Sequence, residues 1–320
     1  AGAGSGKTRV LVHRIAWLQG VEQVAPHAIL AVTFTNKAAA VMRSRITRLL
    51  GAGSGQGYGG MWIGTFHGIA HRLLRAHHLD AGLPQDFQIL DSDDQLRLIK
   101  RVVRALNLDE KQWVPRAVMG YINGKKDDGL RPRDIETYGD STARTWLKLY
   151  ETYQQTCDRA GLVDFAELLL RAHELWLHKP HILEHYQKRF RHILVDEFQD
   201  TNAIQYAWVQ ILASAGSKVM IVGDDDQSIY GWRGARVENI GRFLQDFPGA
   251  RTIRLEQNYR STATILQAAN QLIANNNGRM GKELWTDGAR GEPISVYAAY
   301  NELDEARFVT GRLKQWREPG

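Results

Sequence analysis

Ala1-Gly-Ala-Gly-Ser-Gly-Lys7-Thr8 opens the chain and sets the interpretation of its first half. The stretch fits the phosphate-loop pattern G-x-x-x-x-G-K-[ST] except at the first position, where alanine replaces glycine. Glycines let backbone N–H groups curl around a phosphate, and the helix that follows such a loop adds its dipole. Lys7 is expected to reach the β- and γ-phosphates of a nucleotide, and the Thr8 hydroxyl to hold Mg²⁺. The candidate nucleotide-binding residues of the loop are Gly2, Ala3, Gly4, Ser5, Gly6, Lys7 and Thr8.

Short apolar runs of β-strand composition occur before residue 66 and again after residue 191. They are Ala28–Phe34, Met61–Thr65, His192–Val195, Lys218–Val222 and Thr252–Leu255. Such runs are typical of buried parallel strands. Helical spacing of apolar residues lies between the early runs, at Arg9–Leu18, Asn36–Leu50 and Gly68–His77. This alternation predicts an α/β fold, in which ligands bind beyond the carboxyl ends of the strands.

The stretch from residue 80 to residue 190 has a different pattern. Helical spacing dominates it, and prolines punctuate the helical segments. These segments are Asp91–Leu106, Ala143–Ala160, Asp164–Leu177 and Ile182–Phe190. We therefore expect a mainly helical domain inserted into the α/β domain. Gly51–Gly60 is glycine-rich and is expected to be a flexible loop.

Charge is unevenly distributed along the chain. The net charge is +6, yet residues 1–75 hold nine lysines and arginines against one acidic residue. A basic segment beside a phosphate loop indicates a polyanion ligand, although solvated helix faces would give the same composition. No apolar run approaches the ~20 residues of a membrane helix, so no membrane partner is expected. The single cysteine, Cys157, excludes an intramolecular disulfide and suits a reducing compartment such as the cytosol.

Two acidic residues follow the apolar run His192–Val195. A carboxylate at the end of a strand can hold Mg²⁺, and a second one can polarise the attacking water. We assign Asp196 to the metal and Glu197 to the general base. An acidic turn at the end of a strand is a common structural feature, but its pairing with a phosphate loop favours the catalytic interpretation.

The stretch GDDDQSIYGWRG (223–234) follows another apolar run. Gln227 could sense a γ-phosphate by hydrogen bonding, and Tyr230 and Trp232 could stack on bases. A solvated turn followed by core aromatics is the structural alternative.

The tetrapeptide Gln257-Asn-Tyr259-Arg260 offers two further candidate residues. The arginine could stabilise charge on a γ-phosphate, and the tyrosine could stack on adenine. A surface ion pair would suit the same residues.

Seven segments, in order, resemble the UvrD/Rep family of superfamily 1 DNA helicases. They are AGAGSGKT (1–8), AVTFTNKAA (31–39), GTFHGIAHRLLR (64–75), LVDFAELL (162–169), VDEFQD (195–200), GDDDQSIYGWRGA (223–235) and LEQNYRS (255–261). The match covers essentially the whole chain, and seven ordered motifs make chance negligible.

The resemblance implies a RecA-like P-loop NTPase domain at 1–70 and 191–256 with its first strand missing. An inserted helical domain would occupy 71–190, and the start of a second RecA-like domain 257–320. It further implies an ATP- and Mg²⁺-dependent 3′–5′ DNA helicase and single-stranded DNA translocase that acts in DNA repair or replication. Its expected partners are single-stranded DNA, junctions of single- and double-stranded DNA, and repair proteins, in the cytoplasm near a bacterial nucleoid.

The family's functional residues can be carried over to matching positions of this sequence. The implied ATPase residues are Lys7, Thr8, Asp196, Glu197, Gln227 and Arg260. Arg9 and Tyr259 match residues that sandwich adenine. The implied contacts to single-stranded DNA are Phe34, Thr65, His67, Phe165, Tyr230 and Trp232.

Some family motifs have no counterpart in this chain. The glutamine motif that reads adenine would lie before Ala1, and motifs V and VI would lie beyond Gly320. We therefore expect the chain to be a fragment of a longer helicase. A helicase subunit of a helicase–nuclease and a nucleotide-gated DNA-binding module without turnover are the alternatives.

Overall fold

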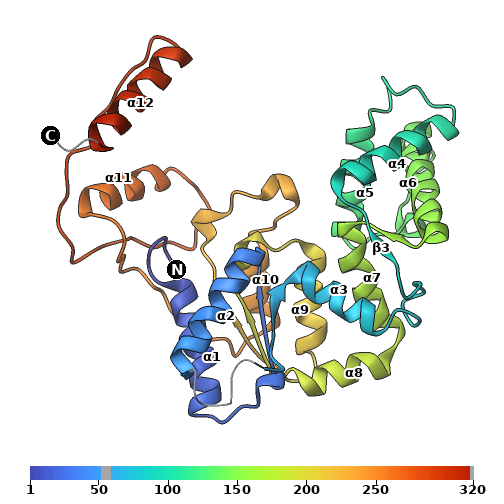
Figure 1. Cartoon of the computed structure of the whole chain (residues 1–320), viewed down its shortest axis with the longest axis horizontal. Coiled ribbons are helices and arrows are strands. Elements are labelled where there is room, and N and C mark those ends of the chain that lie inside the picture. The colour runs from blue at the N-terminus through green and yellow to red at the C-terminus, as the bar shows by residue number, and fades with distance from the viewer. Residues whose placement is uncertain (52–58, 318–320) are drawn as a thin grey trace.

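Four parallel strands form the central sheet of the molecule (Figure 1). The computed structural model describes residues 1–51 and 59–317, so most of the predicted loop Gly51–Gly60 lies outside the described residues. The strands, in the order β2-β1-β5-β6, are β2 (Trp62–Thr65), β1 (Ile29–Thr33), β5 (His192–Val195) and β6 (Lys218–Ile221). Each lies within an apolar run that predicts a strand. These four predictions are confirmed.

The register of the sheet brings the carboxyl ends of its strands to one edge. Thr33 is aligned with Thr65, and Val195 is aligned with both Val32 and Ile221. The polar segments that follow β1, β5 and β6 therefore start close together, as is usual for ligand sites of open α/β sheets.

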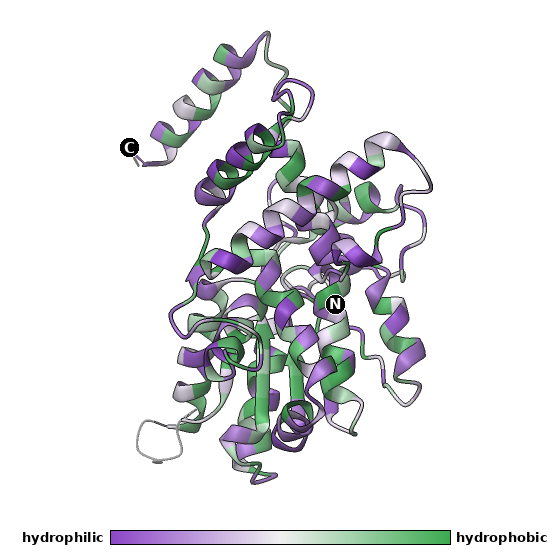
Figure 2. Ribbon diagram, turned by 90° about the vertical axis from the view of Figure 1, so that its right-hand side faces the viewer, coloured by the Kyte–Doolittle hydropathy of each residue, from purple (hydrophilic) through white to green (hydrophobic). Residues whose placement is uncertain are grey.

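Helices cover both faces of the sheet. Helices α1 (Lys7–Gly20) and α2 (Asn36–Leu50) share one apolar cluster with Ile29 and Ala31 of β1. Leu30 and Val32, which point to the other face, join the cluster of α3 (Phe66–Ala76) and α9 (Ala203–Ala213). The alternation follows from the two-residue period of a strand. The strands appear largely in the hydrophobic colour of Figure 2, as expected for a sheet that helices cover on both faces.

A second group of helices has an apolar cluster of its own. It consists of α4 (Ser92–Ala105), α5 (Pro115–Asp127) and α6 (Ser141–Ala160). Figure 1 shows this group beside the sheet domain rather than on a face of the sheet. By contrast, α7 (Phe165–His178) and α8 (Pro180–Arg189) contribute to the cluster that includes the sheet.

Two features of this helical region differ from the sequence pattern. Helix α5 is not predicted, because its apolar residues Val118, Met119 and Ile122 span little more than one turn within a segment that contains Gly120, Gly124 and several charged residues. A short parallel pair of strands, β3 (Gln88–Ile89) and β4 (Leu162–Val163), was also missed. Two-residue strands far apart in sequence carry no periodic signal of their own.

A buried ionic network joins the helical group to α7. Lys126 is 0% exposed, and its Nζ lies 2.7 Å from Asp164 Oδ2 and 2.9 Å from Glu167 Oε2. Tyr153 donates to the same Asp164, and Arg131 forms two hydrogen bonds with Glu167. Burial alone would lower the pKa of Lys126, but the charges of Asp164 and Glu167 outweigh it and raise that pKa. Lys126 and Arg131 hold the pKa of Glu167 well below its usual range, although burial opposes them.

A carboxylate at the end of α5 contacts the start of α9. The Asn202 side chain, which caps α9, donates a 2.9 Å hydrogen bond to Asp127 Oδ1. Burial raises the pKa of Asp127 to about 7, and the charges of Asp128 and Asp164 add to the rise. Ionised Asp127 therefore opposes folding at neutral and alkaline pH.

Asp127→Asn is expected to raise the free energy of unfolding more at pH 8 than at pH 5. Between an unfolded pKa of about 3.9 and the folded pKa of about 7, the native state binds a proton that the unfolded chain does not. The ionised Asp127 carboxylate therefore lowers the free energy of unfolding most above that pH window, and this effect decreases as pH falls through the window. Urea denaturation at both pH values measures the difference, with Asp86→Asn as the exposed control. An equal effect of Asp127→Asn at both pH values would contradict the prediction.

The described residues beyond the sheet form a looser C-terminal segment, here defined as residues 251–317. The run Thr252–Leu255 is not a strand, so this prediction was wrong. The run and β6 both line an apolar cavity of about 530 Å³, and no described hydrogen-bond ladder joins them. The Leu255 carbonyl accepts a backbone hydrogen bond from the Gly2 N–H, but a strand needs a ladder of such bonds, so a strand-like composition does not suffice. The helices of this segment are α11 (Ala263–Ile273) and α12 (Glu302–Arg317), whereas α10 (Asn239–Asp246) precedes it and packs in the cluster that includes the sheet.

The single cysteine lies in the interior of the helical group. Cys157 of α6 is 1% exposed, and burial raises the pKa of its thiol to about 12. No helix among the described residues has the length and apolar composition needed to cross a bilayer.

Candidate functional site

The glycine-rich loop turns directly into α1. Gly4 and Gly6 have φ values of 69° and 88°, a backbone conformation that favours glycine. A Cβ on Gly4 would also lie 2.6 Å from Asn258 Nδ2 and 2.9 Å from Arg260 Cβ. The loop therefore has two reasons for glycine at this position, and the contact brings the segment Gln257–Arg260 against the loop.

Lys7 begins α1 and points its side chain back toward the loop. Its Nζ lies 3.4 Å from the carbonyl oxygens of both Ala1 and Gly2, and 3.5 Å from Asp224 Oδ2. The side chain is buried. The ammonium group is therefore held between the loop and the segment after β6, where a phosphate cradled by the loop would be within its reach.

Thr8 and Asp196 are in direct contact, although 188 positions separate them. The Thr8 hydroxyl donates a 3.0 Å hydrogen bond to Asp196 Oδ2, and the Glu197 N–H donates to Asp196 Oδ1 at 3.1 Å. Asp196 is buried, and burial together with the charge of Glu197 raises its pKa. A buried carboxylate beside a hydroxyl is a hard-oxygen donor set that suits a divalent cation such as Mg²⁺.

Glu197 has a left-handed backbone, with φ of 51°. Such a conformation is uncommon for a residue other than glycine and is often found at functional sites. Its carboxylate accepts a 2.9 Å hydrogen bond from Gln199 Nε2. The side chain is thus oriented by a neighbour while its backbone turns away from the direction of β5.

Gln199 is a further candidate site residue that the motifs did not single out. It is buried, donates to Glu197 and accepts a 3.0 Å hydrogen bond from the Asp224 N–H. It therefore links the segment after β5 to the segment after β6. Its neighbour Asp200 has a pKa raised to about 6 by burial and by the charge of Glu197. A glutamine between acidic residues in VDEFQD was the available signal.

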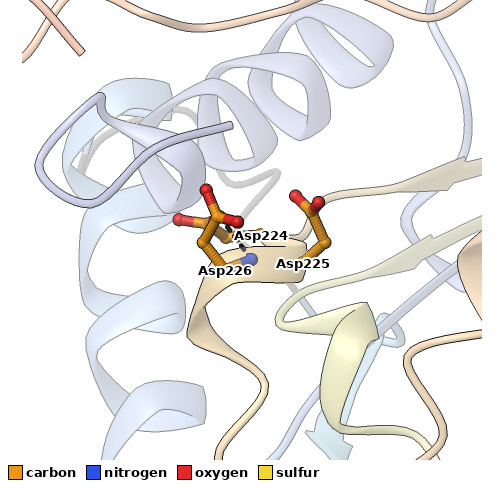
Figure 3. Close-up of side chains that lie close together, drawn as sticks. All are labelled: Asp224, Asp225 and Asp226. Carbon is orange, nitrogen blue, oxygen red and sulfur yellow. Dashed lines mark hydrogen bonds between the residues drawn. The ribbon is translucent and has the colours of Figure 1, made fainter. Parts of the chain in front are cut away.

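Three carboxylates gather in the turn that follows β6 (Figure 3). Asp224, Asp225 and Asp226 have oxygens within 4.8 Å of one another. The Gln227 side chain donates to Asp224 Oδ2, which also faces Lys7. The structure therefore brings Gln227 and Lys7 to one carboxylate, a contact that the sequence analysis did not anticipate.

Asn258 attaches the Gln257–Arg260 segment to the phosphate loop. Its Nδ2 donates a 2.6 Å hydrogen bond to the Ala3 carbonyl, and its Oδ1 accepts from the N–H groups of Arg260 and Ser261. The Tyr259 N–H donates to the Gly4 carbonyl at 3.0 Å. Asn258 is buried, whereas the side chains of Tyr259 and Arg260 are exposed. No local pattern singles out Asn258, because its contacts join segments that are far apart in the sequence.

Arg9 follows the loop in the first turn of α1, and its side chain is exposed. Tyr259 is exposed as well, and its hydroxyl donates a 2.9 Å hydrogen bond to Gln257 Oε1. Both side chains are accessible to a ligand at the loop. No described contact joins them.

Four of the candidate DNA-contacting residues lie at or beside the carboxyl edge of the sheet. Phe34 follows β1 and packs edge-on against Phe66. Thr65 ends β2, and its hydroxyl caps α3 by accepting from the Gly68 N–H. The rings of His67 and Phe165 meet edge to face at 5.9 Å. Burial lowers the pKa of His67 to about 4, so the imidazole is neutral at neutral pH.

Tyr230 and Trp232 lie on the exposed loop after the acidic turn. Trp232 is 75% exposed, and the two ring centroids are 6.4 Å apart. The Arg233 guanidinium lies over both rings, at 5.2 Å from Tyr230 and 4.6 Å from Trp232. A large exposed aromatic side chain beside an arginine can stack on a base, so the core alternative for Trp232 is wrong.

A glycine-rich loop that enters a helix beside a strand-end carboxylate defines the class of P-loop nucleotide-binding domains. Comparison with known families agrees with this geometry. Residues 1–248 match the UvrD/REP helicase N-terminal domain, and residues 253–320 match the UvrD-like helicase C-terminal domain. The chain belongs to the UvrD/REP helicase family.

Curated relatives match along the whole chain. DNA helicase II of Escherichia coli (strain K12) is 72% identical over 320 residues, which are 100% of this chain and 44% of that protein. ATP-dependent DNA helicase PcrA of Leuconostoc citreum is 46% identical over 99% of this chain and 42% of its own length. PcrA of Bacillus subtilis (strain 168) is 44% identical over 100% of this chain and 43% of its own length. The chain thus spans less than half the length of these relatives.

Proposed function

We propose that this chain is the nucleotide-binding front part of an ATP-dependent 3′–5′ DNA helicase that translocates on single-stranded DNA. The observation that carries the proposal is the contact between Thr8 of the phosphate loop and Asp196 at the end of β5. The contact brings together a hydroxyl, a buried carboxylate and the adjacent Glu197 beside the loop, which supports a Mg²⁺ site there. The names of the relatives, DNA helicase II and ATP-dependent DNA helicase PcrA, support ATP and DNA as ligands.

Each residue has a role in hydrolysis that follows from its position. Lys7 balances the charge of the β- and γ-phosphates, and Thr8 and Asp196 would hold Mg²⁺, which neutralises phosphate charge when bound. Glu197 accepts a proton from the attacking water, because it is the carboxylate next to the metal ligand. Gln227 and Arg260 contact the γ-phosphate from two other segments. Arg9 and Tyr259 hold the adenine between them.

The DNA would cross the carboxyl edge of the sheet and the loop of Trp232. Phe34, His67 and Phe165 offer rings at this edge, and stacking on rings does not depend on base sequence. The excess of basic residues in 1–75 supplies phosphate contacts, which make affinity depend on salt. Because His67 is neutral at neutral pH, it contributes a ring and a hydrogen bond rather than a charge.

We also propose a division of the chain into a RecA-like domain (1–70 and 191–256), an inserted helical domain (71–190) and the start of a second RecA-like domain (257–320). The separate apolar cluster of α4, α5 and α6 supports the insertion. Helices α7 and α8 share an apolar cluster with the sheet, so we propose them as the part of the insertion that adjoins the RecA-like domain. The whole protein would act on junctions of single- and double-stranded DNA with repair proteins, in the cytoplasm at the nucleoid.

ATP hydrolysis with and without a single-stranded oligonucleotide tests the proposal. We expect the protein, extended to the full length of its relatives, to hydrolyse ATP faster when DNA is present. The 320-residue chain is expected to bind ATP but to hydrolyse it slowly in both conditions, since it spans 44% of a relative such as DNA helicase II. Phosphate release and binding of a fluorescent ATP analogue are the measurements.

Each outcome has a distinct meaning. Absence of ATP binding by both proteins would contradict the proposed function. Binding without turnover by the extended protein would favour a nucleotide-gated DNA-binding module. Strong DNA-stimulated turnover by the 320-residue chain would contradict the prediction of slow hydrolysis.

Trp232→Ala is expected to weaken binding of a single-stranded oligonucleotide by about 5- to 150-fold, since one stacking contact contributes ~1–3 kcal/mol. Nucleotide binding should be unchanged. Fluorescence anisotropy of a labelled oligothymidylate measures the affinity. Trp316→Ala is the matched control, because Trp316 on α12 is 77% exposed and Trp232 is 75% exposed. Equal affinity of the two variants would rule out the stacking role.

A further inference from the structure

We propose that Lys282 is a positioning residue that sets Lys7 and Gln227 for the terminal phosphates of the nucleotide by holding the carboxylate of Asp224. This inference rests on the proposed function of the phosphate loop. It adds that the C-terminal segment takes part in nucleotide discrimination through an ionic contact with the turn after β6.

Lys282 is the cation around which the three carboxylates gather. Its Nζ lies 2.5 Å from Asp224, 2.9 Å from Asp225 and 2.7 Å from Asp226, and its side chain is only 8% exposed. Arg279 adds two hydrogen bonds to Asp226. Three carboxylates with converging oxygens would suit a divalent cation, but here an ammonium group of the same chain lies among them. The three carboxylates therefore form a binding site for the Lys282 ammonium group.

Asp224 connects this carboxylate cluster to the phosphate loop. Its Oδ1 contacts Lys282, whereas its Oδ2 faces Lys7 at 3.5 Å and accepts a hydrogen bond from the Gln227 side chain. One buried carboxylate is thus shared by two candidate phosphate-contacting residues and by a lysine of the C-terminal segment. The position of Asp224 determines where both phosphate-contacting side chains point.

The charge of Lys282 controls how strongly Asp224 holds Lys7. With Lys282 in place, the negative charge of Asp224 is compensated, and Lys7 can turn from Asp224 to a phosphate. Without it, Asp224 keeps Lys7 in an ion pair and repels the phosphates. ATP carries one more negative charge than ADP, so the loss should weaken ATP binding more than ADP binding.

The experiment measures the ratio of ATP affinity to ADP affinity in the 320-residue chain, with fluorescent nucleotide analogues and Mg²⁺. Lys282→Met is expected to lower the ratio about tenfold, the effect of one uncompensated charge at ~10 Å and an effective dielectric constant of ~20. Lys282→Arg, which keeps the charge, is expected to restore most of the ratio. Lys314→Met on the exposed face of α12 is the control and should leave the ratio unchanged. Circular dichroism melting verifies that each variant is folded.

A folded Lys282→Met variant with the wild-type ratio of ATP to ADP affinity would overturn the inference. A Lys282→Arg variant whose ratio falls as far as that of Lys282→Met would also overturn it. If Lys282→Met does not fold, Asp224→Asn is compared with the Asp224→Asn/Lys282→Met double variant. Once Asp224 is neutral, loss of Lys282 should change the ratio less than about twofold, because coupled residues are non-additive. A further tenfold drop would overturn the inference. If the wild-type chain binds neither nucleotide, the proposed function fails instead.

Discussion

Glu197→Gln is expected to lower the rate of ATP hydrolysis by about 10²- to 10⁴-fold in the protein extended to the length of its relatives. The amide cannot accept a proton from water, and this proton transfer is the role assigned to Glu197. ATP binding should remain, because the proposed phosphate contacts come from Lys7, Thr8 and the loop backbone. Steady-state phosphate release measures turnover, and a fluorescent ATP analogue measures binding.

The geometry around Glu197 makes this substitution informative. Gln199 donates to the Glu197 carboxylate, and the amide oxygen of a glutamine can accept the same hydrogen bond, so the side chain should keep its orientation. Glu305→Gln, at an exposed position of α12, is the matched control. Turnover by Glu197→Gln at the control rate would show that another group activates the water.

Lys126→Met is expected to cost about 3–5 kcal/mol in the free energy of unfolding, because it leaves Asp164 and Glu167 buried without their shared cation. Methionine has nearly the shape of lysine, so the loss reflects charge rather than volume. Urea denaturation followed by circular dichroism measures the cost. Lys125→Met is the control, since Lys125 precedes Lys126 on α5 and is only partly buried.

The cost should depend on pH in a defined direction. The pKa of Glu167 is lowered in the folded state, so its contribution is present above its unfolded pKa of about 4.3 and is lost as pH falls toward the lowered value. The pKa of Lys126 is raised, so its contribution is present below about 10.4 and is lost as pH rises beyond it. A difference between Lys126→Met and wild type that does not shrink below about pH 4 would contradict this account.

Much of the sheet could be predicted because its strands are locally encoded. In β1 every residue is apolar or a threonine and every residue is buried, so composition and burial agree without reference to any other element. Thr252–Leu255 has similar composition but does not form a strand, since strand formation depends on a hydrogen-bonding partner that composition cannot supply. The short pair β3 and β4 is the reverse case. Each strand has a hydrogen-bonding partner, but its two residues are too few to show a periodic pattern in the sequence.

The same distinction between local patterns and long-range contacts applies to the candidate site. Lys7, Thr8 and Asp196 were predicted from motifs whose chemistry is local, and the structure brings Thr8 and Asp196 into contact. Asn258 and Lys282 were missed, because each acts on a segment far away in sequence. Nothing in the residues around Lys282 distinguishes it from an ordinary surface lysine, and only the fold places it among three carboxylates.

Cys157 makes the native chain a convenient background for fluorescence labelling. Maleimide dyes react with thiolates, and a thiol that is 1% exposed with a pKa near 12 offers almost none at neutral pH. A cysteine introduced on the surface would then be the only thiol that takes the dye. Reporter positions on α6 and α12 could be labelled in this way, and movements of the helical group and of the C-terminal segment followed during nucleotide binding, without first removing the natural cysteine.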